Sequence, residues 1–370
     1  MNSKRFFSLD VLRGLAVAIM IIVDAPPAEI YPILKHAEWE GLTIADLAFP
    51  GFVFAMGISA AFSLSRHSIS VKKILKRSAL LFLIGILFNL LPSILALFLW
   101  EDFSSADFFA ATTEHGSLFG ILQRLALTYL LGMILIYFLQ GDKKLFAAAY
   151  GLLIVSSLGF HLYAPENPFA IEKNISGAVD LIFPGANHIY TPNFDPEGLY
   201  GTFSSAALML FGFLAGKILL RDISLQKKIY FLSAMGVIFL CGGVLWSFTD
   251  IISKNLWTAP FSLLTASFEI FLSAGFLKLF DAKKSAEKFF QPLGVLGKNP
   301  LFFFLASNFW LVFFFTIKIE NIPAWHWIFQ HTIADFISTE FSSLIFCLAW
   351  LTIWILCAEF LNRKNIVLKL

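Results

Sequence analysis

Residues 78–100 read SALLFLIGILFNLLPSILALFLW, a run of 23 residues without a charged side chain. A helix needs about 20 apolar residues to cross the hydrocarbon core of a bilayer, so this run is long enough to span a membrane. Similar runs recur along the chain, near residues 9–25, 46–65, 118–140, 145–163, 198–220, 229–249, 257–279, 298–317 and 341–361. Together these runs predict about ten transmembrane helices.

The composition agrees with this interpretation. Of the 370 residues, 58% are hydrophobic and 14% are charged, and the mean hydropathy is +0.78. Soluble domains carry about 25% charged residues, so a soluble globular protein is excluded. Backbone groups in lipid must be hydrogen-bonded within their own segment, so runs of this length favour helices over barrel strands of roughly ten residues. We therefore predict an all-α polytopic membrane protein with a single transmembrane domain over residues 1–370.

Lys and Arg are concentrated in every second connection between the predicted helices. These basic residues are Lys4, Arg5, Arg66, Lys72, Lys73, Lys76, Arg77, Lys143, Lys144, Arg221, Lys227, Lys228, Lys283, Lys284, Lys288, Arg363 and Lys364. The other connections hold Lys35, Lys173, Lys254 and little else. Basic loops next to membrane helices stay in the cytoplasm. The pattern therefore predicts that both termini are cytoplasmic.

Neither the net charge nor the cysteines indicate a nucleic acid or a metal as partner. The formal charge is only +2. Cys241, Cys347 and Cys357 all lie in apolar runs and lack the spacing of metal ligands. We expect no disulfide and no metal site.

The densest group of polar residues in an outer connection is residues 34–50, LKHAEWEGLTIADLAFP. His36 titrates near neutral pH and can take up and return a proton, and Asp24 or Asp46 could orient its ring. Such a pair is the minimum that acyl transfer requires. The alternative is that His36 and Trp39 only anchor the chain at the membrane interface, where aromatic side chains are common.

A few polar side chains fall inside the predicted helices. An ionisable residue in a span costs about 3 kcal/mol, so each needs a partner or a function. Arg124, next to Gln123, could reach an anionic ligand or a buried carboxylate. Asp10 and Arg13 are three residues apart and share one helix face, which permits an ion pair.

Several stretches, taken together, resemble the transmembrane N-acetyltransferases related to heparan-alpha-glucosaminide N-acetyltransferase and their bacterial relatives. The resemblance covers most of the chain and follows the order of the family. It is carried by SLDVLRG at 8–14, by residues 35–50, and by LQRL at 122–125, DPEG at 195–198, GT at 201–202, KNLWT at 254–258 and GKNP at 297–300.

The resemblance implies a single reaction across a bilayer. An acetyl group would pass from cytosolic acetyl-CoA to a glucosamine-type amino sugar on the extracytoplasmic side, with His36 as base or acetyl carrier and no metal. A bacterial relative would lie in the inner (cytoplasmic) membrane as a multi-pass protein. The family usually has Asn where this chain has Asp24, and a carboxylate there would instead raise the basicity of His36.

The resemblance also suggests which residues bind the substrates. The residues expected to bind coenzyme A are Arg124, Gln123, Lys298 and Asn299. Those expected to hydrogen-bond the sugar or stack on its ring are Trp39, Asp195, Glu197, Asn255 and Trp257. For Asp195 and Glu197, capping of the next helix is an equally good explanation.

Two other functions remain open at this point. A transporter would also have many helices and polar residues within them, although no paired half-repeat is visible and the polar residues gather near His36. An O-acyltransferase of envelope polysaccharide would need the same histidine, because a hydroxyl requires a general base even more than an amine does. The oligomeric state is also open, with a homodimer as one alternative.

Overall fold

The computed structural model describes residues 6–114, 116–283, 287–334, 337–366 and 368. Within these residues the only strands are Lys318–Ile319 (β1) and Ile322–Pro323 (β2), which form a short antiparallel hairpin. All other regular structure in the described chain is helical. The predicted all-α fold class is confirmed.

Eight helices of the described chain are long and apolar enough to cross a membrane, or up to nine if one bent pair counts as a span. The eight are α2 (Ala48–Leu64, preceded by η2, Ala45–Leu47), α3 (Val71–Leu99), α5 (Ile121–Phe138), α6 (Asp142–Tyr163), α8 (Thr202–Leu220), α9 (Leu225–Trp246), α10 (Ala259–Phe276, continued by η5, Leu277–Ala282) and α14 (Thr339–Arg363). The protein is therefore a multi-pass membrane protein.

The first and ninth predicted spans differ from the rest. The helix α1 (Phe7–Val23) has 17 residues, the lower limit for crossing the hydrocarbon core. The helix α12 (Pro300–Thr316) also has 17 residues, and it meets α11 (Glu287–Leu296) at an angle of 70°. Pro300 at the start of α12 has no backbone N–H, which suits the first turn of a new helix and not the interior of a continuous one.

Two glycines bring the bend between α11 and α12 against α1. A Cβ on Gly14 would lie 1.8 Å from the carbonyl oxygen of Leu293, and one on Gly297 would lie 1.8 Å from that of Asp10. No other residue type fits this close approach of two backbones. The stretches 8–14 and 297–300 are therefore in direct contact, although they are far apart in the sequence.

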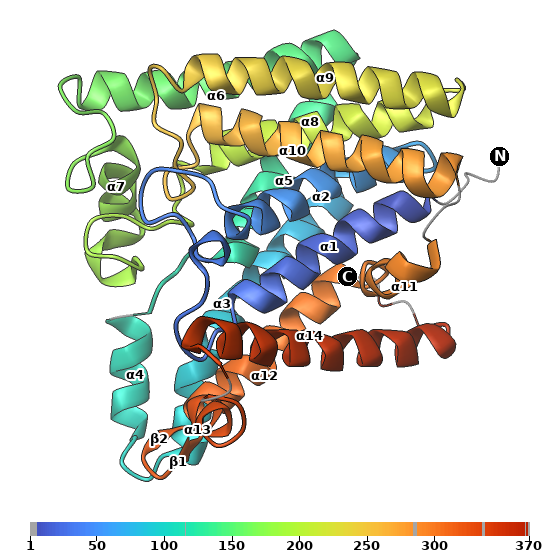
Figure 1. Ribbon diagram of the computed structural model, residues 1–370. Helices are drawn as coiled ribbons and strands as arrows, with labels where there is room; N and C mark the ends of the chain where they lie inside the picture. The colour runs from blue at the N-terminus through green and yellow to red at the C-terminus, as the bar shows by residue number, and fades with distance from the viewer. Residues whose placement is uncertain (1–5, 115, 284–286, 335–336, 367, 369–370) are drawn as a thin grey trace.

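The long helices run side by side, and the molecule has two distinct ends (Figure 1). At one end lie the start of α1, α11 and the last described residues of the chain, since Leu368 donates a backbone hydrogen bond to Asn299 at the start of α12. We call this the inner end. At the outer end lie the short elements η1 (Pro32–Leu34), α4 (Ser105–Thr113), α7 (Ile175–Asp180), η3 (Leu181–Gly185), η4 (Ala186–His188) and α13 (Ala324–Gln330).

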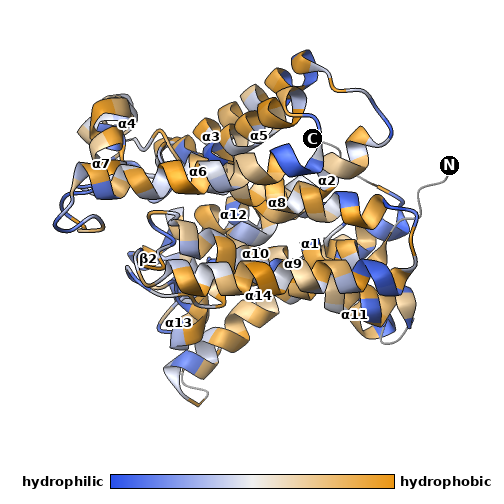
Figure 2. Cartoon of the chain, turned by 90° about the horizontal axis from the view of Figure 1, so that it is seen from above, coloured by the Kyte–Doolittle hydropathy of each residue, from blue (hydrophilic) through white to orange (hydrophobic). Residues whose placement is uncertain are grey.

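The surface agrees with a position in lipid. Hydrophobic residues make up most of the long helices, whereas hydrophilic residues are more common near helix ends and in the connections (Figure 2). Large side chains on α3 and α9, among them Leu83, Leu87, Ile238 and Leu245, are exposed. In contrast, α8 is the most buried of the spanning helices and packs against α2. The core therefore lies around α8, and α3 and α9 present apolar faces to the bilayer.

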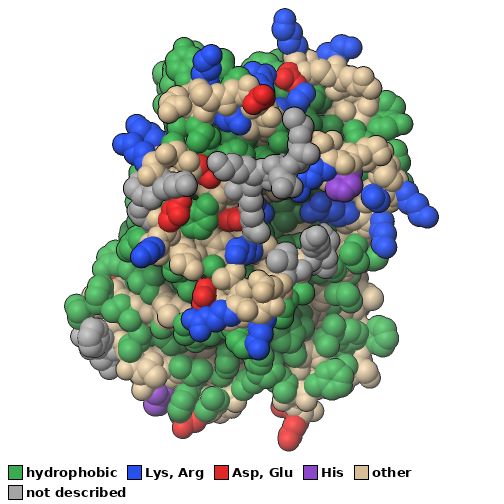
Figure 3. Space-filling model, turned by 90° about the vertical axis from the view of Figure 1, so that its right-hand side faces the viewer, with side chains coloured by type: hydrophobic (Ala, Val, Ile, Leu, Met, Phe, Trp, Pro, Cys, Tyr) green, Lys and Arg blue, Asp and Glu red, His purple; other side chains and the backbone are tan. Residues whose placement is uncertain are grey.

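Lys and Arg side chains are spread over the inner end (Figure 3). This face includes the connections from α2 to α3 and from α8 to α9, which the sequence predicts to be cytoplasmic. Lys4, Arg5 and Lys284 belong to the same predicted set but lie outside the described residues. The cytoplasmic orientation of this end stays a prediction.

Candidate active site

His36 and Asp46 form a hydrogen-bonded pair at the outer end. The Nδ1 atom of His36 lies 2.8 Å from Oδ1 of Asp46, which is fully buried in η2. The other carboxylate oxygen accepts hydrogen bonds from the backbone N–H groups of Ala37 and Thr43 and from the Thr43 hydroxyl, at 3.2, 3.0 and 3.0 Å. Because a carboxylate only accepts, Nδ1 carries the proton and Nε2 keeps its lone pair. The imidazole is thus held as a base.

Two charged side chains from other parts of the chain face this pair. The Nζ atom of Lys254 lies 3.2 Å from both ring nitrogens of His36. Asp24, at the C-terminal end of α1, is close enough for the charges of His36 and Lys254 to act on its carboxylate. Asn308 of α12 donates a hydrogen bond of 3.5 Å to Asp24. The structure therefore brings both predicted acidic partners to His36 and adds Lys254.

A cavity of about 610 Å³, here called the outer cavity, adjoins this group. Asn308 and Glu197 line it, which links the cavity to Asp24 and to the charge of Lys254. Gln123 also lines the outer cavity, and neither of its buried amide atoms has a hydrogen-bond partner among the described residues. A Cβ on Gly85 would lie 2.3 Å from Oε1 of Gln123, so this glycine makes room for the amide. The cavity wall therefore offers free polar groups to a ligand.

The acidic loop 195–198 forms one side of the outer cavity. Asp195 is buried and accepts hydrogen bonds from Ser117, from the N–H of Tyr190 and from the N–H of Glu197, at 3.1, 3.1 and 2.9 Å. The Oε2 atom of Glu197 is buried and has no partner in the described part of the chain. Burial raises the pKa of the Glu197 carboxyl to about 7. Glu197 therefore titrates near neutral pH beside the cavity.

Capping of α8 by the acidic pair is not what the structure shows. The helix begins at Thr202, with Gly201 as the N-cap residue, so Asp195 and Glu197 lie well before its first turn. A Cβ on Gly201 would come within 2.3 Å of the Arg124 guanidinium. The chain must pass close to Arg124 before α8 can start, which explains why the acidic pair stays in the loop.

Arg124 of α5 holds the loop 195–198 in place through hydrogen bonds. Its guanidinium donates to the carbonyl oxygens of Gly198, Pro196 and Glu197, at 2.5, 3.3 and 3.3 Å, and it is buried. It also lies over the ring of Trp257, 5.5 Å from the ring centroid. These contacts occupy most of the guanidinium. Its Nη1 atom has no hydrogen-bond partner among the described residues. Arg124 therefore positions the loop, and its binding of coenzyme A stays a prediction.

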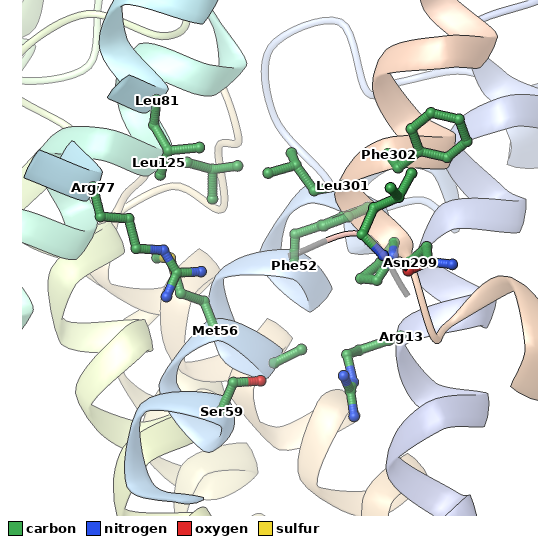
Figure 4. Close-up of a pocket in the computed structure, with 13 residues that line it drawn as sticks. Arg13, Phe52, Met56, Ser59, Arg77, Leu81, Leu125, Asn299, Leu301 and Phe302 are labelled. Carbon is green, nitrogen blue, oxygen red and sulfur yellow. Dashed lines mark hydrogen bonds between the residues drawn. The ribbon is translucent and has the colours of Figure 1, made fainter. Parts of the chain in front are cut away.

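A second cavity of about 360 Å³, the inner cavity, lies toward the other end (Figure 4). Arg77 of α3 and Arg13 of α1 flank it from opposite sides, with Met56 and Ser59 of α2 between them (Figure 4). An adjoining cavity of about 320 Å³ shares Ser59 and Arg77. Its wall adds His67 and Lys73. No Asp or Glu is among the described residues that line either cavity, but Asp10 forms an ion pair with Arg13 at 2.9 Å. The positive charge that favours an anion therefore comes mainly from Arg77 and Lys73.

The other two residues expected at coenzyme A lie near this inner cavity. Asn299 lines it, while its side chain donates to the carbonyl of Ile366 and accepts from the N–H of Leu368. The Nζ atom of Lys298 donates to Asn362 of α14 at 2.5 Å. Thus Asn299 lies at the inner cavity, Gln123 lies at the outer one, and Lys298 contacts the end of α14.

The two cavities follow one another along α3, α5 and α12. Each of these helices lines both cavities, with residues about one turn apart such as Leu81 and Gly85, Leu125 and Leu122, and Leu301 and Phe304. At the boundary the rings of Phe52 and Phe304 are 6.0 Å apart. The two cavities therefore lie one after the other between the basic inner end and the loop that carries Glu197, with two aromatic rings at their boundary.

The remaining residues expected at the sugar differ in their accessibility. The Trp39 indole donates to the carbonyl of Phe169 at 3.0 Å, and the Asn255 amide donates to the carbonyl of Glu38 at 2.8 Å. Trp257 is completely buried between Phe49 and Arg124, so neither face of its ring is open to a sugar. We leave Trp257 out of the acceptor site.

The family model for the catalytic region of heparan-alpha-glucosaminide N-acetyltransferase matches residues 5–247. The chain belongs to this family. The heparan-alpha-glucosaminide N-acetyltransferase of Mus musculus is 26% identical over 430 residues, an alignment that covers 100% of this chain and 61% of the relative. That of Homo sapiens is also 26% identical, over 99% of this chain and 60% of the relative. The chain thus spans about three fifths of the length of these relatives, and the resemblance inferred from the motifs is confirmed.

The heparan-alpha-glucosaminide N-acetyltransferase family match includes His36, Asp46 and Glu197 but ends before Lys254. Lys254 opens the stretch KNLWT, and its place in an outer connection with few other basic residues is a signal that sequence reasoning could have used. From the sequence, Arg13 is expected only in an ion pair with Asp10, and Arg77 only as one of the basic residues of a cytoplasmic connection. Their common cavity depends on the packing of α1 against α2 and α12, which their sequence positions do not reveal.

Proposed function

We propose that this protein transfers an acetyl group from acetyl-CoA, bound from the cytoplasm at the inner cavity, to the amino group of a glucosamine-type sugar at the outer cavity. The observation that carries the proposal is the line of two cavities between α3, α5 and α12. One end is basic, and the other is linked through Asn308 to Asp24, on which the charge of His36 acts. A reaction across a bilayer needs such a path, since donor and acceptor approach from opposite sides.

The inner cavity suits the donor. Coenzyme A carries phosphate groups, and Arg guanidinium groups recognise phosphate with short, charge-assisted hydrogen bonds. Arg77 and Arg13 flank the inner cavity, and Lys73 and His67 extend the positive charge into the adjoining one. With the phosphates held there, the thioester would point along α3 and α12 toward the outer cavity.

The outer cavity suits an amine that arrives with a positive charge. The Glu197 carboxylate would hold the ammonium group, and the amide of Gln123, which has no partner among the described residues, would hydrogen-bond hydroxyl groups of the ring. Asp195 keeps Glu197 in place through its backbone N–H. The acceptor site would therefore combine one carboxylate with neutral polar groups, as an amino sugar requires.

His36 would move the proton. An amine that attacks the thioester must lose a proton, and Nε2 of His36 has the free lone pair to take it, while Asp46 stabilises the imidazolium through Nδ1. In a second route Nε2 itself takes the acetyl group and passes it to the amine. Both routes use the same tautomer and the same carboxylate, and both leave the sugar acetylated on nitrogen.

The proposal is tested with purified protein in detergent, by following free thiol released from acetyl-CoA with glucosamine, glucose or no acceptor. We expect release that depends on glucosamine and falls to background in His36→Ala but not in His331→Ala, a change at an exposed histidine of the same end. Thermal unfolding confirms that both variants are folded. Release with glucose but not glucosamine would overturn the N-acetyltransferase in favour of an O-acyltransferase. No release with either sugar, and no thermal stabilisation by coenzyme A, would favour a transporter.

A further inference from the structure

Lys254 occupies a special place among the charged residues of the outer end. Its Nζ atom lies 3.2 Å from both Nδ1 and Nε2 of His36. Its charge also acts on the carboxylates of Asp24, Asp46 and Glu197. Lys254 therefore lies between the His36–Asp46 pair and the acidic wall of the outer cavity. The acetyl group would be transferred from coenzyme A to the sugar at this place.

The loop that carries Lys254 is tied to the loop that carries His36. The N–H of Gly41 donates to the carbonyl of Ile252, and the amide of Asn255 donates to the carbonyl of Glu38, both at 2.8 Å. These two hydrogen bonds lie on either side of Lys254 in the sequence. They fix the distance between the two loops, so the contact between Lys254 and His36 does not depend on their side chains alone.

The same loop is anchored to the helices on its other side. Asp250 is buried and accepts hydrogen bonds from the Ser157 hydroxyl, at 2.6 Å, and from His161 Nε2, at 3.0 Å. Trp257 has a φ of 49°, in the left-handed region that a bulky residue rarely adopts. Its buried ring packs 5.4 Å from that of Phe49. Both ends of the loop are thus fixed by buried contacts.

The charge of Lys254 is not neutralised by an ion pair. No carboxylate of the described residues lies within ion-pair distance of its Nζ atom, and the side chain is half-buried. Lys35, the other lysine of this region, pairs with Glu29. An ammonium group held beside an imidazole without a carboxylate of its own opposes protonation of that imidazole. It is also free to bind a negative oxygen.

We propose that Lys254 is a catalytic residue of the acyl transfer, whose ammonium group, held beside the imidazole of His36, stabilises the oxyanion that forms on the thioester carbonyl. This inference rests on the proposed acetyltransferase function. It requires only that the carbonyl carbon approaches Nε2 of His36, because Lys254 already lies beside that atom. Preorganised donors of this kind are a large term in acyl transfer.

In the direct route the amine attacks the thioester while His36 acts as the base. The Glu197 carboxylate first takes the extra proton of the sugar ammonium group. The neutral amine nitrogen then forms a bond to the carbonyl carbon, and the π electrons of the carbonyl move to oxygen, beside the Lys254 ammonium. The nitrogen gives one proton to Nε2 of His36. The oxygen then reforms the double bond, the C–S bond breaks, and the leaving thiolate takes the proton from His36. In the carrier route Nε2 forms the first bond, the same oxyanion faces Lys254, and the C–S bond breaks to release the thiolate. The amine then attacks the acetyl group on Nε2, the bond from carbon to Nε2 breaks, and the proton lost by the amine passes through Nε2 to the thiolate.

The test compares Lys254→Met, which keeps the length of the side chain without the charge, with Lys254→Arg and with Lys173→Met as the matched control. Lys173 is an exposed lysine of another outer loop. We expect Lys254→Met to lower kcat by about 10²-fold with little change in the KM for acetyl-CoA. Lys254→Arg should keep part of the activity, and Lys173→Met should behave like wild type.

The pH profile separates this role from a structural one. The charged groups that face His36 are Asp46 from η2, Asp24 from the end of α1, and Lys254. Both carboxylates favour the imidazolium and Lys254 opposes it, so loss of the ammonium should move the acidic limb of kcat to higher pH. A Lys254→Met enzyme with wild-type kcat and an unchanged acidic limb would overturn the proposal, as would equal loss in folded Lys254→Met and Lys254→Arg.

A rescue experiment covers the case in which Lys254→Met does not fold. In Lys254→Cys, alkylation with 2-bromoethylamine rebuilds a side chain that ends in an ammonium group. Wild type treated in the same way controls for Cys241 and Cys357, which are exposed. Recovered thiol release supports the proposal, and a folded, fully alkylated protein without recovery contradicts it. If wild type itself releases no thiol, the proposed function fails and not the role of Lys254 alone.

Discussion

The rings of Phe52 and Phe304 lie 6.0 Å apart, between the cavity that holds Arg13 and Arg77 and the one that holds Gln123 and Glu197. Phe52 lines the inner cavity and Phe304 lines the outer one. A thioester that enters from the inner end must pass this pair to reach His36. The two rings thus lie at the boundary between the two cavities, which our account requires the acetyl group to cross.

A change in ring size at Phe304 should alter which acyl groups pass. We expect Phe304→Ala to accept propionyl-CoA and butyryl-CoA better than wild type, relative to acetyl-CoA, because the removed ring leaves space at the boundary. Phe304→Trp should lower kcat with acetyl-CoA about tenfold or more through overlap with Phe52. Thiol release with each donor measures both effects. An unchanged donor preference in a folded Phe304→Ala enzyme would show that the acyl group takes another route.

Removal of the charge on Asp46 should stop the reaction without removing the histidine. In Asp46→Asn the amide no longer holds the proton on Nδ1, so the imidazole loses its tautomer and its stabilising charge. We expect kcat to fall by about 10²-fold or more. Glu172→Gln, in an exposed outer loop, is the matched control. Wild-type kcat in Asp46→Asn would contradict the role that we assign to the pair.

Loss of Arg77 should weaken the donor and leave the acceptor unaffected. We expect Arg77→Gln to raise the KM for acetyl-CoA about tenfold, since a hydrogen bond to a charged group contributes about 1.5–3 kcal/mol. The KM for glucosamine should not change. Lys76 is a neighbouring exposed residue that does not line the cavity. Lys76→Gln should therefore leave the KM for acetyl-CoA unchanged. An equal effect of both changes would indicate a general effect of surface charge and not a donor site at Arg77.

The titration of Glu197 should appear in the affinity for the sugar. Burial raises the pKa of this carboxyl to about 7, so the group is neutral below that pH and charged above it. We expect the KM for glucosamine to fall as the pH rises through about 7 in wild type, and to fall less in Glu197→Gln. Titration of the amine itself is common to both enzymes, so the ratio of the two KM values isolates Glu197. A constant ratio from pH 6 to pH 8 would exclude Glu197 from the acceptor site.

The same shift has a consequence for stability. A carboxyl whose pKa is raised in the folded state binds more protons there than in the unfolded chain, so its contribution to stability falls as the pH rises through about 4.5 to 7. We expect the Tm of wild type to fall more over this interval than that of Glu197→Gln. Thermal unfolding in detergent measures the difference. Parallel Tm curves would show that the pKa of Glu197 is the same in the folded and unfolded states, so that burial does not raise it.

Most of the fold could be predicted from the sequence, because hydrophobic runs long enough to span a membrane leave few alternatives to a transmembrane helix. Every predicted run contains a helix, and the all-α class follows from the need to pair backbone groups in lipid. The short helices α4, α7 and α13 at the outer end were not predicted, since helices of fewer than about ten residues depend on tertiary packing. The start of α8 at Thr202 depends on Arg124, which no local pattern shows.

The candidate site was predicted in part, for a similar reason. His36 and Asp46 are separated by 10 residues in one loop, so their pairing could be anticipated. Lys254 is 218 residues from His36, and Asn308 is 284 residues from Asp24. Periodicity carries no information on such pairs, which are set by how α10 and α12 pack in the bundle. The two cavities and the ring pair between them likewise depend on packing.

The most direct test of the central claim separates the two substrates by a membrane. The protein is reconstituted in vesicles with labelled acetyl-CoA on the side of the inner end and glucosamine on the other, and orientation is checked by labelling a cysteine placed in the connection between α8 and α9. Our account predicts N-acetylated glucosamine on the acceptor side, free thiol on the donor side, and neither with His36→Ala. Product that forms only when both substrates share one side, or no product in either arrangement, would contradict it.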